Sequence, residues 1–464
     1  MNVISTLERF DPQRVHKDAV RILCEMGFKV PDEKIRDQLG QRLTVKGERV
    51  FFGEEIVEEF TREIRTAEVR LSKLEDGKLT IFPSGWSPYF VDPETLEIKP
   101  YDTKTLSDFA KLVCSLTDDG VVAGGVPGFP LDVPSQLQFI TQYYINCLYN
   151  TKPSAPGTAY TPEIMEFLVE MAEVMGHQIG VGVQPISPLT LAGSSVEVAI
   201  EFSHRDVEIW LDPMPMMGIS APLDWYAAWA QAVAENLGSY IMLRILGLKK
   251  IGLSLRLFPA SMLSGMIFFG SPQYLTSLLT RKKVREFYNL SSPGAESMLT
   301  LAKLPDPQAA AEKGIQMALA AMAGFRTFEG AGTLAIDEVF SPQQLMIDIE
   351  IKNYVENILK ELSGEMSTSE DMIQLVREGL EGSFLSAGTT FDRWRSFYWL
   401  PSLFDQTSRA KWEGNKRKIL DRAWESAQER ISKYEYELEG DKRREFTPTK
   451  LDLSRPLTSI RTST

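Results

Sequence analysis

The feature that most constrains this chain is a repeated alternation that begins near residue 101. Short apolar runs take turns with longer segments whose apolar residues recur at helical spacing. This alternation is typical of βα units and favours a parallel sheet. The runs predict seven strands, and GSFLSAG at 382–388 is a candidate for an eighth. The seven predicted strands are residues 121–126, 154–160, 179–186, 207–214, 250–258, 285–290 and 324–330.

Eight such units predict an α/β fold of the TIM (β/α)8 barrel type, and a doubly wound open sheet is the alternative. Proline- and glycine-rich loops follow several of the predicted strands, which favours the barrel, because barrel sites gather at strand ends. The chain carries no GxGxxG after its first strand and no GxxxxGK[ST], the loops that cradle dinucleotides and triphosphates. Its 464 residues fit one barrel with insertions.

The flanking segments predict a cap and a tail. We expect an N-terminal α+β cap over 1–100, the barrel over 101–390 and a helical extension over 391–464. The cap is predicted to contain helices within 12–40 and 54–67, a hairpin at RLTVKGERVFF, and a β-rich flap with turns at Asp76-Gly77 and Pro93-Glu94. A helix in the tail is predicted to pack through Ile419, Leu420, Trp424 and Ile431.

The charge and the cysteine content limit which partners the chain can bind and in which cellular compartment it can lie. The chain has 63 acidic and 50 basic residues, a net charge of −13, which argues against a nucleic-acid partner. Its three cysteines predict no disulfide framework and fit a reducing cytoplasm. We expect no signal peptide and no membrane span, because charges interrupt the candidate segments. Exposed helices such as 341–362 would allow a homo-oligomer.

The histidines and cysteines do not fall into patterns that bind metals. Three histidines and three cysteines occur without CxxC, HxH or HExxH spacing, so we expect no metal site. The GxSxG elbow of many serine hydrolases is also missing from the sequence, which disfavours ordinary hydrolysis.

Aromatic residues cluster in the loops that follow the predicted strands. Rings there would suit a quaternary ammonium ion, because a cation over an aromatic face needs no hydrogen-bond donor. The alternative for each ring is a place in the core, and Trp225 and Trp229 lie four residues apart, as on one buried helix face. The candidate substrate-binding rings are Trp86, Tyr89, Tyr160, Trp225, Trp229, Phe258 and Phe328.

A few polar residues complete the predicted site. Arg256 lies among apolar neighbours and needs an anion, either a substrate carboxylate or, as we favour, a structural acid such as Glu235 or Asp212. Glu329 and Glu235 are the candidate catalytic acids, although Glu235 alternatively lies on a helix surface. Gln184, at the start of QPISPLT, is a further candidate for substrate binding.

The order of several longer segments resembles the trimethylamine methyltransferase family over nearly the whole chain. These segments include AVRILCEMGFKVPDEKIRDQL, YFVDPETLEIKPYDTKTLSDFAKLV, DPMPMMGISAPLDWYAAWAQAVAENL and WLPSLFDQTSRAKWEG. The resemblance implies a TIM barrel that binds no cofactor itself and passes a methyl group to cobalt(I). That cobalt belongs to the cobalamin (corrinoid) of a separate corrinoid protein, which docks over the barrel mouth.

The resemblance also bears on the substrate. Archaeal trimethylamine enzymes of the family contain pyrrolysine, whereas this chain shows only standard residues. The resemblance therefore implies the branch that demethylates betaines such as glycine betaine. Thr389 stands where relatives are expected to carry histidine, so a role for that position is not transferred.

Leaving-group chemistry agrees with a quaternary substrate. Such an amine leaves as a neutral tertiary amine that needs no proton, so the protein only has to hold and orient it. The alternatives are a methyltransferase for a tertiary methylamine, a non-catalytic binding protein for methylated amines, and an unrelated lyase or hydrolase that uses Glu235 or Glu329.

Overall fold

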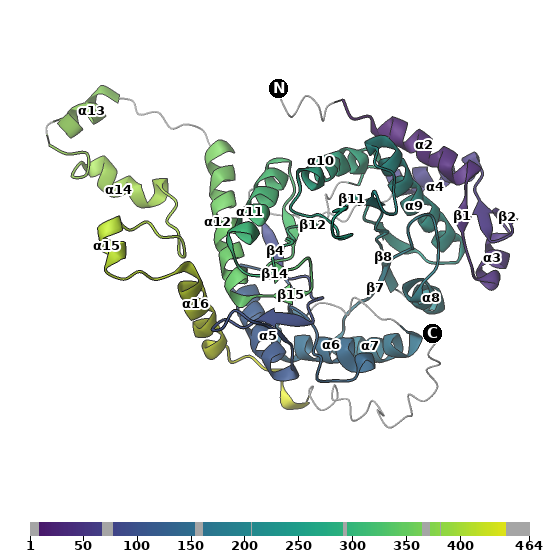
Figure 1. Cartoon of the computed structure of the whole chain (residues 1–464), viewed down its shortest axis with the longest axis horizontal. Coiled ribbons are helices and arrows are strands. Elements are labelled where there is room, and N and C mark those ends of the chain that lie inside the picture. The colour runs from purple at the N-terminus through teal and green to yellow at the C-terminus, as the bar shows by residue number, and fades with distance from the viewer. Residues whose placement is uncertain are drawn as a thin grey trace.

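The computed structural model shows a mixed α/β protein in which helices surround a central group of strands (Figure 1). It describes residues 9–66, 78–153, 161–205, 207–290, 295–363, 372–380 and 382–441. The helices are α2 (Pro12–Glu25), α3 (Glu33–Leu39), α4 (Glu54–Thr66), α5 (Thr103–Asp118), α6 (Gln138–Tyr149), α7 (Pro162–Met175), α8 (Ser194–Glu201), α9 (Trp225–Ile245), α10 (Pro272–Phe287), α11 (Pro307–Met322), α12 (Pro342–Ser363), α13 (Met372–Leu380), α14 (Gly388–Phe397), α15 (Arg409–Glu413) and α16 (Ile419–Lys433).

The strands are short, and many pair in parallel. They are β1 (Phe28–Lys29), β2 (Thr44–Lys46), β3 (Arg49–Phe51), β4 (Thr80–Phe82), β5 (Tyr89–Val91), β6 (Ile98–Pro100), β7 (Ile179–Val183), β8 (Val207–Leu211), β9 (Met216–Met217), β10 (Lys250–Leu253), β11 (Phe258–Pro259), β12 (Ala295–Ser297), β13 (Thr327–Glu329), β14 (Thr333–Leu334) and β15 (Val339–Phe340).

Two parallel sheets form the centre of the molecule. One has the order β10-β8-β7 and aligns Val183, Leu211 and Leu253. The other has the order β12-β13-β4 and aligns Ser297, Glu329 and Phe82. The strands predicted within 179–186, 207–214, 250–258 and 324–330 are thereby confirmed. Within the described residues, backbone pairing does not join the two sheets into a closed barrel.

Three strand predictions need correction. The strand predicted at 285–290 is wrong, because residues 285–287 form the last turn of α10. The next strand along the chain is β12. Residues 382–388 form bends and turns that lead into α14. The segment at β4, predicted as part of the flap, pairs in parallel with β13.

Two further predicted strands have different outcomes. Residues 121–126 form no assigned strand, although the Ala123 N–H donates to the Ile81 carbonyl across 2.8 Å. The predicted strand 154–160 and the predicted turn Asp76-Gly77 lie outside the described residues.

Helix starts follow the sequence chemistry. Asp224 caps α9 and Asp306 caps α11, each carboxylate accepting a backbone N–H of the first helical turn. Helix α9 is buried on nearly all sides, between the β7-β8-β10 sheet and α2, which explains its long apolar run. Gly238 of α9 permits this packing, since a Cβ there would lie 2.6 Å from the Phe28 ring.

The flanking segments largely follow expectation. β2 and β3 form the predicted hairpin around Gly47, whose φ of +60° suits glycine. β5 and β6 form another hairpin around the predicted Pro93-Glu94 turn. Helix α16 packs on α12 and α5 through the four predicted apolar residues. No helix in the described ranges combines the length and apolar character that crossing a bilayer requires. The predicted domain boundaries stay a prediction.

Candidate functional site

Three charged side chains meet where β8, β10 and β13 end. The Arg256 Nη1 lies 3.3 Å from the Asp212 Oδ2, and its Nη2 lies 3.9 Å from the Glu329 Oε2. The same Nη2 donates to the carbonyl of Ala295, at the start of β12, across 3.2 Å. The structural-acid alternative for Arg256 therefore holds, with Asp212 as the acid. Carboxyl ends of parallel strands are where α/β proteins bind ligands.

Two carboxylates share the Arg256 guanidinium. Asp212 and Glu329 carry two carboxylates against one guanidinium, and the Asp212 Oδ1 is buried without a hydrogen-bond partner in the described part of the chain. Burial raises the pKa of Glu329, the charge of Arg256 opposes this rise, and the charge of Asp212 adds to it. Burial lowers the pKa of Arg256, but the neighbouring carboxylates outweigh burial and raise it. The charges of Arg281 and Arg285 also act on Arg256, and Arg281 pairs with Glu296, so the wider set holds three guanidinium groups and three carboxylates.

Strand β8 brings an aromatic ring to the same place. Val207, Ile209 and Leu211 are buried in the core, so the alternate residues Glu208, Trp210 and Asp212 point to the opposite face. Trp210 is 45% exposed, although it lies on the middle strand of its sheet. The Trp210 side chain therefore shares a strand face with Asp212, while its ring lies over Gly180, level with Glu208.

The Trp210 ring rests on glycine. Gly180 on β7 lies under the ring, and a Cβ there would be 2.3 Å from the Trp210 Cη2. Gly252 on β10 flanks the ring on the other side, where a Cβ would be 4.0 Å from the Cδ1. Trp210 is not among the rings predicted from the sequence, although the period-two alternation in VEIWLD contains the signal.

Three of the predicted rings belong to the core. Trp229 is completely buried, and its Nε1 donates to the Thr280 Oγ1 across 2.9 Å. Phe258 and Phe328 are buried as well. The core alternative thus holds for these three rings, because each belongs to a buried hydrophobic cluster.

The other predicted rings lie on separate elements. Trp86 packs edge-on against Phe139, with ring centroids 5.6 Å apart. Tyr89 is partly exposed on β5, and Trp225, the first residue of α9, packs at the edge of the core. Tyr160 lies outside the described residues. The predicted cage therefore stays a prediction.

Glu235 performs a different task from Glu329. It is buried on α9 and accepts hydrogen bonds from the Ser187 Oγ (2.5 Å), the Leu189 N–H (3.1 Å) and the Gln231 Nε2 (2.8 Å). Burial raises its pKa, and these hydrogen bonds oppose that rise. Glu235 is therefore neither a helix-surface charge nor a partner of Arg256. Its hydrogen bonds to Ser187 and Leu189 hold the loop after β7 in place. The exposed Gln184 stands at the start of that loop.

Large apolar side chains are exposed in the loops that follow β7, β8 and β11. Leu223 and Met262 lie next to each other, since a Cβ on Gly218 would contact both. Exposed apolar patches of this kind mark interaction surfaces, and methionine suits adaptable ones. We call this set the apolar rim: Ile186, Met214, Ile219, Leu223, Met262, Leu263, Met266 and Phe268.

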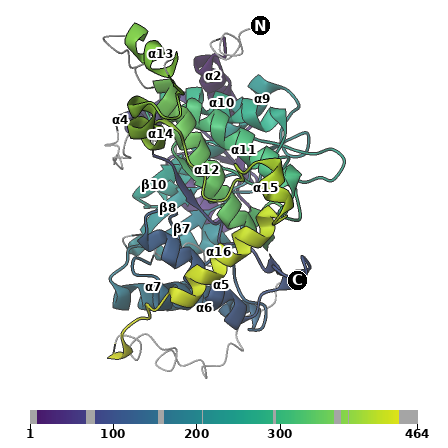
Figure 2. The same cartoon turned by 90° about the vertical axis from the view of Figure 1, so that its left-hand side faces the viewer.

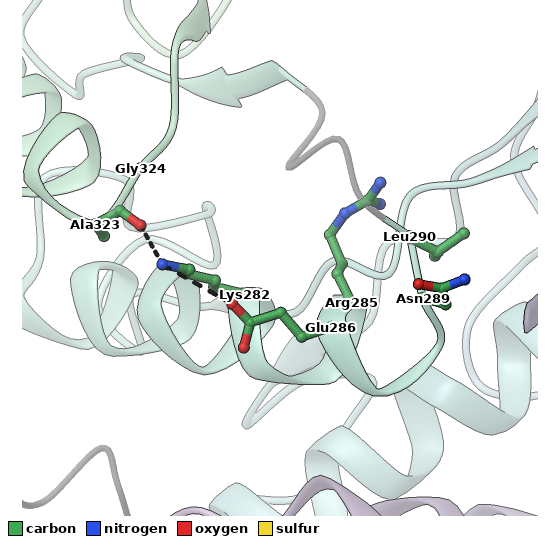
Figure 3. A pocket seen from close by; sticks show the side chains of 7 residues that line it. All are labelled: Lys282, Arg285, Glu286, Asn289, Leu290, Ala323 and Gly324. Carbon is green, nitrogen blue, oxygen red and sulfur yellow. Dashed lines mark hydrogen bonds and ion pairs between the residues drawn. The ribbon is translucent and has the colours of Figure 1, made fainter. Parts of the chain in front are cut away.

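A separate pocket lies between the C-terminal ends of α10 and α11, near the starts of β12 and β13 (Figure 3). Lys282 lines this pocket, donates to the Ala323 carbonyl across 2.6 Å and lies 3.9 Å from Glu286. Arg285, which also lines the pocket, donates to the carbonyls of Leu253 and Ser254 at the end of β10. In the described ranges, no group of three or more His, Cys, Asp or Glu side chains is arranged to hold a metal ion.

These features define an α/β protein with a candidate site at the carboxyl ends of parallel strands, where Arg256 pairs with Asp212 and an exposed indole lies on the same face of β8. The family model for trimethylamine methyltransferase (MTTB) matches residues 2–447. The chain belongs to this family.

Individual relatives align over part of their length. The trimethylamine methyltransferase MttB of Methanosarcina thermophila is 29% identical over 238 residues, 51% of this chain and 48% of the relative. MttB of Methanosarcina barkeri (strain Fusaro) is 31% identical over 210 residues, 44% of this chain and 41% of the relative. MttB of Desulfitobacterium hafniense is 25% identical over 248 residues, 52% and 49% of the two chains. The match thus spans about half the length of these curated relatives.

Among solved structures, the Methanosarcina barkeri monomethylamine methyltransferase (MtmB) aligns with a TM-score of 0.45 and 10% identity. The alignment covers 91% of this chain and 93% of that one.

Proposed function

We propose that this chain is a methyltransferase that moves a methyl group from a quaternary amine, such as glycine betaine, to the cobalt(I) of a separate corrinoid protein. The observation that carries the proposal is the exposed Trp210 ring on the strand face that also carries Asp212, the partner of Arg256. A cation over a desolvated indole gains about 2 kcal/mol or more. The carboxylates of Asp212 and Glu329 would add attraction for the same ion.

The proposed fold around this site is a (β/α)8 barrel. The described strands would follow one another in the order β4, 121–126, β7, β8, β10, β12 and β13, so that β4 takes the place that the sequence suggests for 382–388. Three hydrogen bonds support this order. The Ala123 N–H donates to the Ile81 carbonyl of β4. Arg256, in the loop after β10, and Arg281, on α10, both donate to the Ala295 carbonyl of β12. The ring of helices in Figure 1 agrees with it.

The proposed reaction requires few catalytic groups from the protein. Cobalt(I) supplies the nucleophile, and a quaternary amine departs as a neutral tertiary amine, so no general acid is required. Trp210 would hold the cationic nitrogen, while Asp212 and Glu329 stabilise its charge. Because Arg256 is already engaged with both carboxylates, the carboxylate of a betaine would bind other donors, such as backbone N–H groups of the surrounding loops.

The apolar rim supports docking of the corrinoid protein over this site. Its side chains lie on the loops at the end of the strands from which a methyl group would leave. A protein interface needs an apolar centre of this kind. The cobalamin would arrive with that partner and would not reside in this chain. The free thiols of Cys24, Cys114 and Cys147 agree with a reducing cytoplasm.

The test is to mix the chain with a reduced corrinoid protein and candidate amines and to follow methyl-cobalt formation by absorbance. The proposal expects conversion with a quaternary amine. Conversion with trimethylamine alone would favour a tertiary substrate, and tight binding without transfer would favour a binding protein. Turnover without any corrinoid protein would favour a lyase or hydrolase.

A further inference from the structure

Lys313 of α11 and Asp348 of α12 form an ion pair that the proposed reaction does not use. The two helices lie side by side (Figure 1, Figure 2), and both side chains are 0% exposed. The Lys313 Nζ lies 2.7 Å from the Asp348 Oδ2. Burial of both charges costs free energy, and well-packed apolar residues often replace such a pair without loss of stability. The pair therefore needs an explanation other than stability alone.

The pair holds the chain directly after Glu329. The Lys313 Nζ also donates to the Gly330 carbonyl, across 2.8 Å. The Asp348 Oδ2 also accepts the Gly332 N–H, across 2.7 Å. Each charged side chain thus binds one peptide group of the turn in which β13 ends and the chain enters β14.

This turn needs anchors because of its glycines. Gly330 and Gly332 have φ of +106° and +73°, and glycine backbones are free to adopt many other conformations. On the strand side, the N–H groups of Gly330 and Ala331 donate to the Phe82 carbonyl of β4 across 2.8 and 3.0 Å. On the helix side, the buried ion pair supplies the anchors.

The backbone decides where the Glu329 carboxylate lies. Phe328 is buried in the core, so the alternation along β13 turns Glu329 to the opposite face, toward Arg256. Within the described ranges, the Glu329 carboxylate forms one ion pair, 3.9 Å from the Arg256 Nη2. A contact of this length is not a hydrogen bond and holds a side chain only weakly. A shift of the turn would therefore move the carboxylate.

We propose that Lys313 and Asp348 are positioning residues, which hold the turn after β13 so that the Glu329 carboxylate stays beside Arg256 at the strand ends. Their effect on a bound ammonium ion passes through Glu329, and for this consequence the inference rests on the proposed function. The orientation of Glu329 is testable without any substrate.

The main variant removes the pair as a unit. Lys313→Met combined with Asp348→Leu deletes both charges and leaves neither of them buried without its partner. If this double variant does not fold, as judged by circular dichroism, Lys313→Met alone takes its place, since Asp348 still accepts the Gly332 N–H.

Asp348→Asn is the conservative variant. Its amide oxygen can still accept the Gly332 N–H. Burial already lowers the pKa of Lys313, so beside a neutral amide Lys313 can lose its proton and still donate to Gly330. Both anchors of the turn are thus retained, and we expect Asp348→Asn to behave like the unchanged chain.

Lys352→Met is the matched control on the same helix. Lys352 is buried and lies 3.1 Å from Glu356. Glu356 accepts the Leu79 N–H just before β4 begins, so this pair holds the opposite end of that strand from Phe82. We expect its replacement to leave Glu329 unaffected.

The first measurement uses no substrate. Glu329→Gln is introduced into each background, and urea unfolding at several pH values gives the stability difference that Glu329 makes. Burial raises the pKa of Glu329, the charge of Arg256 opposes this rise, and the charges of Asp212 and Asp337 add to it. In the unchanged chain, Glu329→Gln therefore gains relative stability as pH rises.

In the double variant we expect a smaller gain with rising pH, because the released turn lets water reach the Glu329 carboxylate. The Asp348→Asn and Lys352→Met backgrounds should keep the full gain. The same gain in the double variant as in the unchanged chain would overturn the proposal, because a pair that only stabilises the helices would not affect Glu329.

The second measurement is the affinity for tetramethylammonium, by calorimetry. We expect the double variant to bind about tenfold more weakly, and Glu329→Gln to add no further loss in that background. Losses that multiply would mean that the pair acts through another group, and they would overturn the proposal. If the unchanged chain does not bind tetramethylammonium, the proposed function fails, and the first measurement still decides whether the pair positions Glu329.

Discussion

Trp210 and Gly180 are a matched pair on adjacent strands, because the indole of Trp210 occupies the space that a side chain at residue 180 would need. The glycine on β7 thus sets where the ring on β8 lies. The acidic cluster begins two residues beyond the ring, at Asp212. The position of the ring relative to these charges is the geometry on which the proposed function depends.

The pair yields a prediction with an internal control. Gly180→Ala should displace the indole, because its Cβ would lie 2.3 Å from the ring, and affinity for a quaternary amine should fall about tenfold, equivalent to about 1.4 kcal/mol. Gly252→Ala, on the other side of the same ring, places its Cβ at ordinary contact distances and should change affinity little. Calorimetric titration compares the two variants. Equal losses in both would contradict this role of Gly180.

Removal of the ring should have a larger effect than its displacement. Trp210→Ala should weaken binding of tetramethylammonium or glycine betaine by roughly thirtyfold, corresponding to about 2 kcal/mol. Trp210→Phe should retain part of the affinity, because a smaller ring still presents a negative face. A neutral analogue with a tert-butyl group is the control, and its weaker binding should depend less on Trp210. If both ligands lose the same factor, the ring acts through its surface area alone.

Arg256 should matter more for stability than for contact with substrate. Arg256→Met leaves Asp212 and Glu329 close to each other without their shared cation, so the free energy of unfolding should fall by about 1–3 kcal/mol at neutral pH. Part of this loss should return in acid, where the carboxylates take up protons. Urea unfolding at several pH values measures both effects. A loss that does not vary with pH would mean that lost packing dominates.

Glu329 should impose a pH dependence on stability. Its pKa in the folded chain is raised, chiefly by burial, above that in the unfolded chain. Between the two values the folded state binds more protons, so stability falls as pH rises. Glu329→Gln should therefore gain stability relative to the unchanged chain as pH rises from 4 to 8. Glu338→Gln, an exposed change nearby, is the control and should show little such trend. A difference that shrinks with rising pH would contradict this sign.

Local patterns predicted those parts of the fold that local spacing determines. The strands at β7, β8, β10 and β13 follow short apolar runs, and the helices begin at residues that cap them. β4 was assigned to the flap because its partner β13 lies far along the chain, and no local pattern reveals such pairing. The strand predicted at 285–290 is wrong, because REFYNL, the last turn of a helix and the residues after it, resembles a short strand.

The site was predicted less completely than the fold. The pairing of Arg256 with Asp212 followed from the cost of an unpaired buried charge, which sequence alone can indicate. The rings could not be sorted in this way, since Trp229 and Trp210 both stand among apolar neighbours. Only the burial of β8 on one face shows that Trp210 points away from the core, whereas Trp229 lies within it.

The most direct test of the central claim is a crystal structure of the chain with a bound quaternary amine. We predict that the ammonium nitrogen lies within about 6 Å of the Trp210 ring centroid and on the side of Asp212 and Glu329. A nitrogen bound instead against Trp86 or Tyr89, or in the pocket between α10 and α11, would contradict the account.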